Sequence, residues 1–297
     1  MHRTAVYLAA MPVHTAIGRF TVAPVYAKPR VRSALRSQVL LGEPLRLHTR
    51  VGNFWEATYD DGRAEGFVAA DQVIEVDPDL FREQTEQASF ALDLFGMLLS
   101  DAYGMPVTFG ARLPAYDGLQ LRHDKRRFLY SGQAVLAGDV TQGADVLLRL
   151  GRKWLYVPEL AGGRTPTGVG DAELVQLLLA VMGIDLPRAL VAMSRGGQAV
   201  DFVEQCQAGD LAFFDDGKGA LTHVGLLFPG SQVLHVSGRV RVDAVDHFGI
   251  FNVEERRYSH RLRIVKRYLP EAPATQAIEL DDRYSEPDVD TQQILIF

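Results

Sequence analysis

Cys206 is the only cysteine among the 297 residues, so the chain offers one thiol and no disulfide framework or multi-cysteine metal site. His223 and His235 lie in two short apolar runs, THVGLLF and QVLHV. An imidazole can act as a general base and acid, but it can also be an inert ring bonded within a sheet. Asp171 opens an apolar helical run, where aspartate is a favoured N-cap worth about 0.5–2 kcal/mol. These residue types leave a catalytic and a structural interpretation open.

The sequence around these residues predicts an antiparallel sheet packed on a buried helix. Residues 171–183 are apolar on most sides of the expected helix, which is typical of a helix at the centre of a domain. A second helix is expected at 144–155. The loops DDGKG and PGS separate short strands as hairpins. The expected strands are 211–214, 222–228, 232–236 and 239–243. This combination is an α+β layout.

The N-terminal half has the pattern of two β modules joined by a helix. Short strands and tight turns over residues 1–78 predict a small barrel, with a hairpin at Asp60-Asp61-Gly62. Apolar residues then recur near helical spacing, which predicts a helical connector over 79–103. Residues 104–143 return to short strands and predict a second β module. Trp55 in the first barrel is either a core residue or an aromatic that contacts a ligand.

Composition and charge are those of an ordinary soluble globular protein. Hydrophobic residues make up 47%, charged residues 23%, and the formal net charge is −6, which disfavours a nucleic-acid partner. No apolar run approaches the roughly 20 residues that span a bilayer. The first residues are interrupted by Pro12 and His14 and favour a first strand over a signal peptide. We expect a cytoplasmic location, with a periplasmic or cell-surface location as the alternative. Residues 271–297 are an acidic tail, expected to be a solvated linker rather than a partner-binding arm.

The segment 209–243, GDLAFFDDGKGALTHVGLLFPGSQVLHVSGRVRVD, resembles the NlpC family of bacterial papain-like cell-wall peptidases. Its GDLAFF, HVG and HVSGRVRVD runs carry the likeness. Residues 248–269 are similar to the closing segment of members with N-terminal bacterial SH3-like domains. The resemblance implies SH3-like barrels at 1–78 and 104–143, followed by a papain-like α+β domain at 144–270.

The resemblance also implies a cysteine-peptidase site without its cysteine. Family members cut peptidoglycan stem peptides, typically between γ-D-glutamate and a diamino acid, with a thiolate at the N-terminus of the buried helix. A histidine acts as base and acid, and a third polar residue orients its ring. Carried over, His223 matches the base, His235 matches the orienting residue, and Asp171 stands where the family has its cysteine. Cys206 matches no catalytic position.

Positions expected in the substrate groove depart from the family pattern as well. The family's Pro-Tyr-x-Trp-Gly-Gly loop is Pro-Glu-Leu-Ala-Gly-Gly at 158–163, without the aromatics. After Leu186-Pro187-Arg188, family members commonly have a polar stretch that begins with aspartate. This chain has Ala-Leu-Val-Ala-Met there, at 189–193. These residues either line an apolar groove or pack on the core. The other residues expected at the groove are Glu159, Ala161, Arg188 and Trp55.

We therefore predict an inactive relative of the cell-wall endopeptidases that binds a peptidoglycan-derived peptide or a partner protein. A carboxylate is a poor nucleophile toward an amide, so Asp171 does not replace a thiolate. Two alternatives stay open: an active γ-D-glutamyl-diamino-acid endopeptidase, if Cys206 reaches His223, and a scaffold or adaptor without a small ligand. No cofactor is expected. A metal site would need convergence of two imidazoles and up to two carboxylates, namely those of His223, His235, Glu159 and Asp171.

Overall fold

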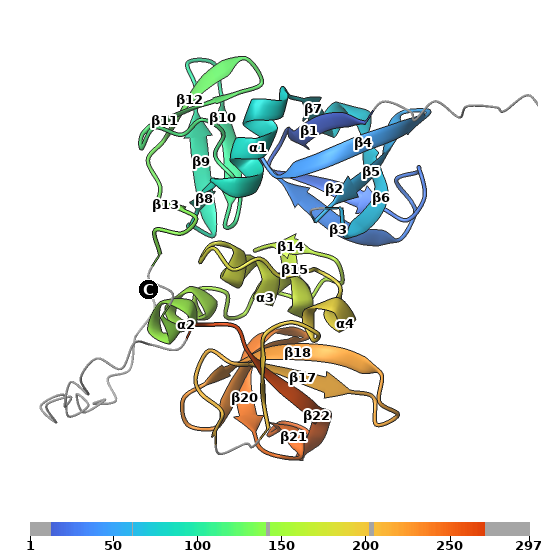
Figure 1. Ribbon diagram of the computed structural model, residues 1–297, viewed down its shortest axis with the longest axis vertical. Coiled ribbons are helices and arrows are strands. Elements are labelled where there is room, and N and C mark those ends of the chain that lie inside the picture. The colour runs from blue at the N-terminus through green and yellow to red at the C-terminus, as the bar shows by residue number, and fades with distance from the viewer. Residues whose placement is uncertain (1–12, 61, 141–142, 202–204, 271–297) are drawn as a thin grey trace, which may run out of the picture.

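The computed structural model describes residues 13–270, except residues 61, 141–142 and 202–204. The two N-terminal β units lie at one end of the molecule, the C-terminal sheet lies at the other, and helices fill the space between them (Figure 1). The first predicted strand falls mostly in 1–12 and the acidic tail is 271–297, so both predictions lie outside the described residues. Within the described ranges, no helix is long and apolar enough to cross a membrane.

The first β unit is an antiparallel sheet with the strand order β3-β2-β6-β5-β4-β1-β7. In β4, the buried residues Leu45 and Leu47 alternate with the partly exposed Arg46 and His48, so one face packs into the core. The elements are β1 His14–Gly18, β2 Val22–Tyr26, β3 Leu35–Leu40, β4 Pro44–Val51, β5 Phe54–Tyr59, β6 Ala64–Ala69, the 3₁₀ helix η1 Ala70–Gln72 and β7 Val73–Glu75.

The helical connector predicted over 79–103 is wrong beyond Glu86. Helix α1, Pro78–Glu86, begins at Asp77, whose side chain accepts hydrogen bonds from the amides of Asp79 and Leu80, and Pro78 takes the first helical position. After α1 the chain forms the strands β8, Ser89–Ala91, and β9, Phe95–Leu99. Closely spaced apolar residues fit a helix and a strand equally well when the run is short.

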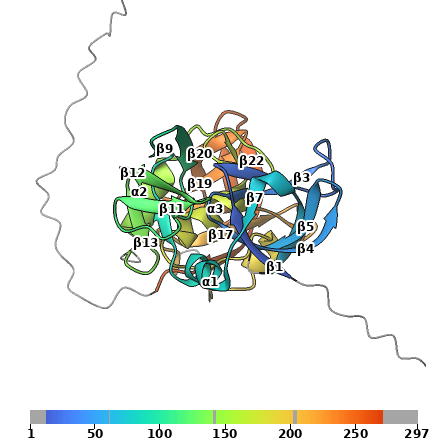
Figure 2. The ribbon, with the colours of Figure 1, turned by 90° about the horizontal axis from the view of Figure 1, so that it is seen from above.

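The second β unit begins with these strands. Its sheet has the order β10-β9-β12-β11, and β8 pairs separately with β13. The remaining strands are β10 Gly104–Thr108, β11 Gln120–His123, β12 Arg126–Tyr130 and β13 Ala134–Leu136. Seen from above, the two N-terminal β units stand side by side (Figure 2). Whether either unit is an SH3-like barrel stays a prediction.

The C-terminal sheet contains the four predicted strands, each within two residues of its expected bounds. Its order is β16-β22-β17-β18-β19-β20-β21, and β21 also pairs with β22, so β17 to β22 close into a barrel. The strands are β16 Gln198–Val200, β17 Leu211–Asp215, β18 Leu221–Phe228, β19 Gln232–Ser237, β20 Arg239–Val245, β21 Gly249–Asn252 and β22 Arg257–Arg267. A compact apolar cluster forms on one face of this sheet from Ala212, Phe214, Leu227, Val233, Ile250 and Val265.

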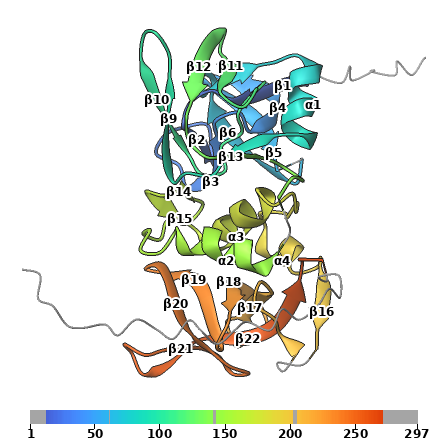
Figure 3. The same ribbon diagram turned by 90° about the vertical axis from the view of Figure 1, so that its left-hand side faces the viewer.

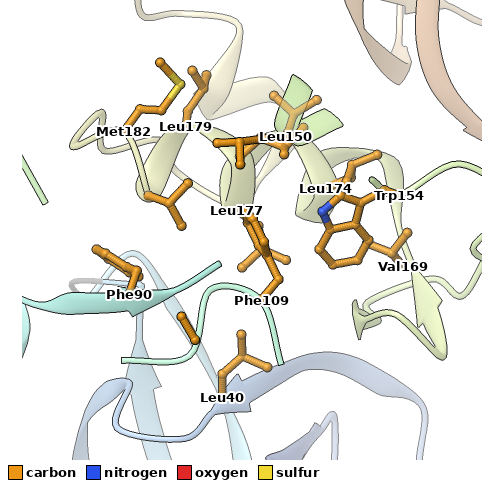
Figure 4. Packing of buried hydrophobic residues seen from close by; sticks show 14 of the residues in the cluster. Leu40, Phe90, Phe109, Leu150, Trp154, Val169, Leu174, Leu177, Leu179 and Met182 are labelled. Carbon is orange, nitrogen blue, oxygen red and sulfur yellow. The ribbon is translucent and has the colours of Figure 1, made fainter. Parts of the chain in front are cut away.

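Helix α3, Asp171–Ala180, is the predicted buried helix and lies between the N-terminal units and the C-terminal barrel (Figure 3). Leu177 faces Leu40 and Phe109 of the N-terminal units (Figure 4). At Gly110, where φ is +81°, an added Cβ would lie 2.6 Å from Leu177 Cδ2, so the N-terminal chain approaches the helix too closely for a larger residue. Because partners cover it on both sides, α3 has no solvent-facing polar side. The other elements here are α2 Ala144–Arg152, β14 Arg164–Thr165, β15 Gly168–Val169 and α4 Leu190–Met193.

Candidate functional site

Asp171 is the first residue of α3, and its carboxylate is directed at the sheet. Gly170 is the N-cap and no side chain caps the helix, so the predicted N-cap role of Asp171 is wrong. Its Oδ2 accepts a hydrogen bond from His223 Nδ1 at 2.9 Å and from the amide of Val224 at 3.0 Å. Burial alone would raise the pKa of Asp171, but the hydrogen bond from His223 and those from two backbone amides lower it. The carboxylate is therefore ionised at neutral pH.

His223 and His235 belong to a chain of hydrogen bonds that begins at Asp171 and crosses the sheet. His223 Nε2 lies 2.9 Å from His235 Nδ1, and His235 Nε2 lies 2.9 Å from Asp243 Oδ2. Arg241 donates to Asp243 at 2.9 Å and extends the line to the surface. Both histidines are buried. Strands β18, β19 and β20 are hydrogen-bonded neighbours, which is what brings these side chains together.

The hydrogen bonds in this line require one proton more than two neutral imidazoles carry. Three bonds link Asp171, the two rings and Asp243, and each needs one proton, whereas two neutral rings supply two. Burial lowers the pKa of His235, which favours its neutral form. The additional proton is therefore shared within the network of Asp171, His223, His235 and Asp243.

His260 is a third histidine in the site, and the sequence analysis missed it. Its ring on β22 stacks on His223 with centroids 4.1 Å apart and planes 24° apart. Burial, and the neighbouring rings of His223 and His235, lower the pKa of His260 to about 4. The only sequence signal for His260 was its place in the family-like closing segment 248–269. No motif marked it as a residue of the site.

The four side chains considered as metal ligands do not form one cluster in the structure. Among the described residues, the only group of three or more ligand-type side chains with donor atoms within 4.8 Å of one another is His223, His235 and His260. Glu159 is exposed instead, and its Oε2 accepts a hydrogen bond from the amide of Gly238 at 2.7 Å. The stacked rings of His223 and His260 point their nitrogen lone pairs along nearly parallel planes, whereas a tetrahedral zinc site needs them to converge. In this arrangement the rings of His223 and His260 do not both direct a lone pair at one tetrahedral ion.

A surface hollow of about 800 Å³ opens beside His260. Its lining combines the exposed rings of Phe248 and Tyr258 with the carboxylates of Asp215 and Asp216. Of the three histidines, His260 lines this open hollow.

Arg188 does not line a groove, contrary to the prediction. Its guanidinium is buried, donates to Ser37 Oγ at 2.9 Å and pairs with Glu43 of the first β unit. Arg164 pairs with the same carboxylate at 2.6 Å. A buried acid with two guanidinium partners thus connects the C-terminal domain to the first β unit.

The other predicted groove residues have mixed positions. Ala161 is exposed in the loop before β14, a place compatible with a groove wall. Trp55 packs on the core of the first sheet and lies 5.7 Å from the ring of His14, as its core interpretation predicts. In the segment 189–193, Met193 is buried and Leu190 packs on the main core, while Val191 is half-exposed. Two of the five residues thus pack on the core, and Ala189 and Val191 are exposed.

Cys206 lies at the other end of the barrel from the histidines. It lines a hollow with Leu227 and Phe228 and packs on the apolar cluster of the sheet. His223 precedes Leu227 by four residues on β18, a rise of about 13 Å along a strand. The thiol is therefore far beyond hydrogen-bond reach of the imidazole.

The contacts of Asp171 predict a stability effect. We expect Asp171→Ala to lower the free energy of unfolding by about 1–3 kcal/mol, because the buried amide of Val224 and the ring of His223 lose their acceptor. Chemical denaturation of both proteins measures this difference. Asp145→Ala, which removes an exposed carboxylate of α2, is the control and should change stability by less than about 1 kcal/mol. Equal effects of the two substitutions would contradict the network.

Comparison with known proteins identifies the C-terminal domain. The NlpC/P60 family model matches residues 158–263, and these residues form an NlpC/P60 family domain. Two curated relatives are named gamma-D-glutamyl-L-lysine dipeptidyl-peptidase. The protein from Bacillus subtilis (strain 168) is 31% identical over 111 residues, 37% of each chain. The protein from Bacillus cereus (strain ATCC 10987 / NRS 248) is 34% identical over 97 residues, 32% of this chain and 29% of the relative. The matches thus span little more than a third of these relatives at most.

Solved structures extend the similarity in fold to most of the chain. An NlpC/P60 family protein from Bacillus cereus ATCC 10987 aligns with a TM-score of 0.72 and 19% identity, over 86% of this chain and 100% of the other. An NlpC/P60 endopeptidase from Photobacterium damselae subsp. piscicida aligns with a TM-score of 0.65 and 13% identity, over 84% and 70%. The chain therefore shares its fold with both structures over more than four fifths of its length.

Proposed function

We propose that this protein binds a peptidoglycan stem peptide without cleaving it. The observation that carries the proposal is the carboxylate of Asp171, which lies 2.9 Å from His223 Nδ1 at the position where the family resemblance puts the nucleophilic thiolate. A carboxylate attacking an amide would have to form an anhydride, which is a poor acyl intermediate. With Cys206 at the far end of the barrel, no other thiol can take over.

The contact between Asp171 and His223 supports retained binding. The ionised carboxylate of Asp171 has the charge of a thiolate and accepts a hydrogen bond from His223, as a thiolate would. The curated relatives are named for a γ-D-glutamyl-L-lysine substrate. We therefore propose an L-Ala-γ-D-Glu-L-Lys segment, or its counterpart with another diamino acid, as the ligand.

The two N-terminal β units fit a supporting role in this proposal. We propose that both are SH3-like modules that narrow the groove and add docking surface. The buried pairs of Glu43 with Arg164 and Arg188 fix the first unit against the NlpC/P60 domain. A rigid junction of this kind keeps a groove preformed, which lowers the entropy cost of binding.

Calorimetric titration with L-Ala-γ-D-Glu-L-Lys tests the binding. We expect the native protein to bind the peptide with a Kd below about 1 mM, equivalent to about −4 kcal/mol. Ala161→Trp should weaken binding at least tenfold, because the bulky ring enters the expected groove from an exposed loop position. Ala102→Trp, on an exposed loop of the second β unit, is the matched control. No heat of binding with the native protein, or equal weakening by both substitutions, would argue for a partner protein instead.

A further inference from the structure

A cavity of about 240 Å³ lies where the two N-terminal β units meet the NlpC/P60 domain. The first unit contributes residues of β4 and β5, helix α1 contributes Phe81, and the second unit contributes Phe90 and Arg112. Helix α3 and the turn after it contribute Gln176 and Ile184. Cavities between domains that combine apolar walls with a few charged groups are typical small-molecule sites.

The guanidinium of Arg112 is part of the cavity wall and has few protein partners. It has five N–H donors and, among the described residues, donates one hydrogen bond, to the backbone carbonyl of Gln84. No carboxylate in the described part of the chain forms an ion pair with it. Its Cζ lies 5.4 Å from the centroid of the Phe90 ring, so the face of the guanidinium is stacked and its edge carries the remaining donors. Those donors can bind a ligand that enters the cavity.

The lining of the cavity contains charges of both signs. The buried Glu43 pairs with Arg164 and Arg188. Asp185 pairs with Arg63 at 2.8 Å. The charged residues of the lining are the acids Glu43, Asp60, Glu86 and Asp185 and the bases Arg46, Arg63 and Arg112. Two of the acids are therefore paired with guanidinium groups other than that of Arg112.

The other two acids do not pair with Arg112 either. Asp60 accepts hydrogen bonds from Arg63, and Glu86 is exposed to water. Burial, the largest effect, lowers the pKa of Arg112, and the charge of Glu43 offsets this lowering only in part. A partly buried cation without a counter-ion of its own favours an anionic ligand.

We propose that this junction cavity binds a small monocarboxylate that has an apolar body. The carboxylate pairs with the edge of the Arg112 guanidinium, where two parallel N–H donors match its two oxygens. The apolar body lies against Phe81, Phe90 and Ile184. Such a ligand contacts both β units and the NlpC/P60 domain, so it binds the assembled protein and stabilises that assembly. A purely inorganic anion would leave the apolar walls uncovered.

Fluorine NMR with 4-fluorobenzoate as the probe tests this site in the full-length protein. We expect a Kd below about 1 mM, and at least about tenfold weaker binding of 4-fluorobenzamide, which has the same ring but no charge. An equal concentration of inorganic phosphate should displace little of the bound probe, because phosphate lacks an apolar body. The proposal is overturned by the absence of 4-fluorobenzoate binding, by equal binding of the amide, or by full displacement with phosphate.

Substitutions at the cavity decide whether the probe occupies it. Arg112→Gln should raise the Kd of 4-fluorobenzoate at least about tenfold, whereas Arg122→Gln, at an exposed position of the same β unit, should leave it unchanged. Ala137→Phe keeps Arg112 but fills the cavity from a partly buried position of its lining, and it should weaken binding to a similar extent. Circular dichroism checks that each variant is folded, and Ala137→Phe decides the question if Arg112→Gln is not. Undiminished binding by a folded Arg112→Gln or Ala137→Phe protein would place the probe elsewhere and contradict the proposal.

Discussion

Replacing Asp171 by cysteine is expected to give a protein that cleaves L-Ala-γ-D-Glu-L-Lys, at a rate at least about 10³ times that of the native protein. The new thiol would start α3, where the helix dipole favours a thiolate. It would also face His223, whose Nδ1 lies 2.9 Å from the present carboxylate oxygen. His223 is already hydrogen-bonded to His235 and through it to Asp243, so the proposed base and its proposed orienting residue are already in contact.

Controls for this gain of activity come from the same site. Asp171→Ser removes the carboxylate without supplying a thiol and should remain inactive. Asp171→Cys combined with His223→Ala should lose most of the new activity, because no base remains to activate the thiol. If Asp171→Cys folds and binds the peptide but does not cleave it, the groove no longer presents the scissile bond to the helix terminus.

The junction between the first β unit and the NlpC/P60 domain should show the largest loss of stability. We expect Glu43→Gln to lower the free energy of unfolding by about 3–5 kcal/mol, because it leaves the buried guanidinium groups of Arg164 and Arg188 without their counter-ion. Urea denaturation at neutral pH measures the loss. Glu65→Gln, an exposed position in the same β unit, should change stability by less than about 0.5 kcal/mol.

The pH dependence of this effect has a defined sign. Burial alone would raise the pKa of Glu43, but Arg164, Arg188 and Arg112 lower it from 4.5 to about 2. A lowered native pKa means that the ionised carboxylate contributes stability above about pH 4.5, on the order of 3 kcal/mol, and that this contribution is lost as the pH falls toward 2. The difference between the native protein and Glu43→Gln should therefore shrink between pH 5 and pH 2. A constant difference over this range would show that Glu43 is not ionised in the folded protein.

Local sequence patterns predicted the C-terminal domain well. Strand spacing and turn residues between 209 and 243 gave the hairpins, and the apolar run from Asp171 gave the buried helix. The family-like motifs then brought Asp171, His223 and His235 together correctly, because each stands at a fixed place on those elements. The helix predicted over 79–103 is wrong after α1, because a short apolar run fits the helical and the strand periodicity equally well. Asp77 is an N-cap signal only for α1.

Contacts between residues far apart in the chain could not be predicted from the sequence. Arg188 looked like a groove residue, but its partner Glu43 lies 145 residues away in the chain, and no local pattern announces such a pair. His260 reaches the site only because β22 pairs with both β17 and β21 and closes the barrel. The side chain of Asp171 does not cap the helix, because it accepts a hydrogen bond from the amide of Val224, 53 residues further along the chain. Each of these depends on tertiary packing rather than on sequence spacing.

Binding without cleavage is tested by incubating the native protein with a saturating amount of L-Ala-γ-D-Glu-L-Lys and quantifying free lysine by mass spectrometry. We predict that the peptide is bound, as seen by calorimetry on the same sample, and that lysine stays at the level of a protein-free control. Lysine release that exceeds this control and disappears in His223→Ala would contradict the account, because the site would then be a working peptidase.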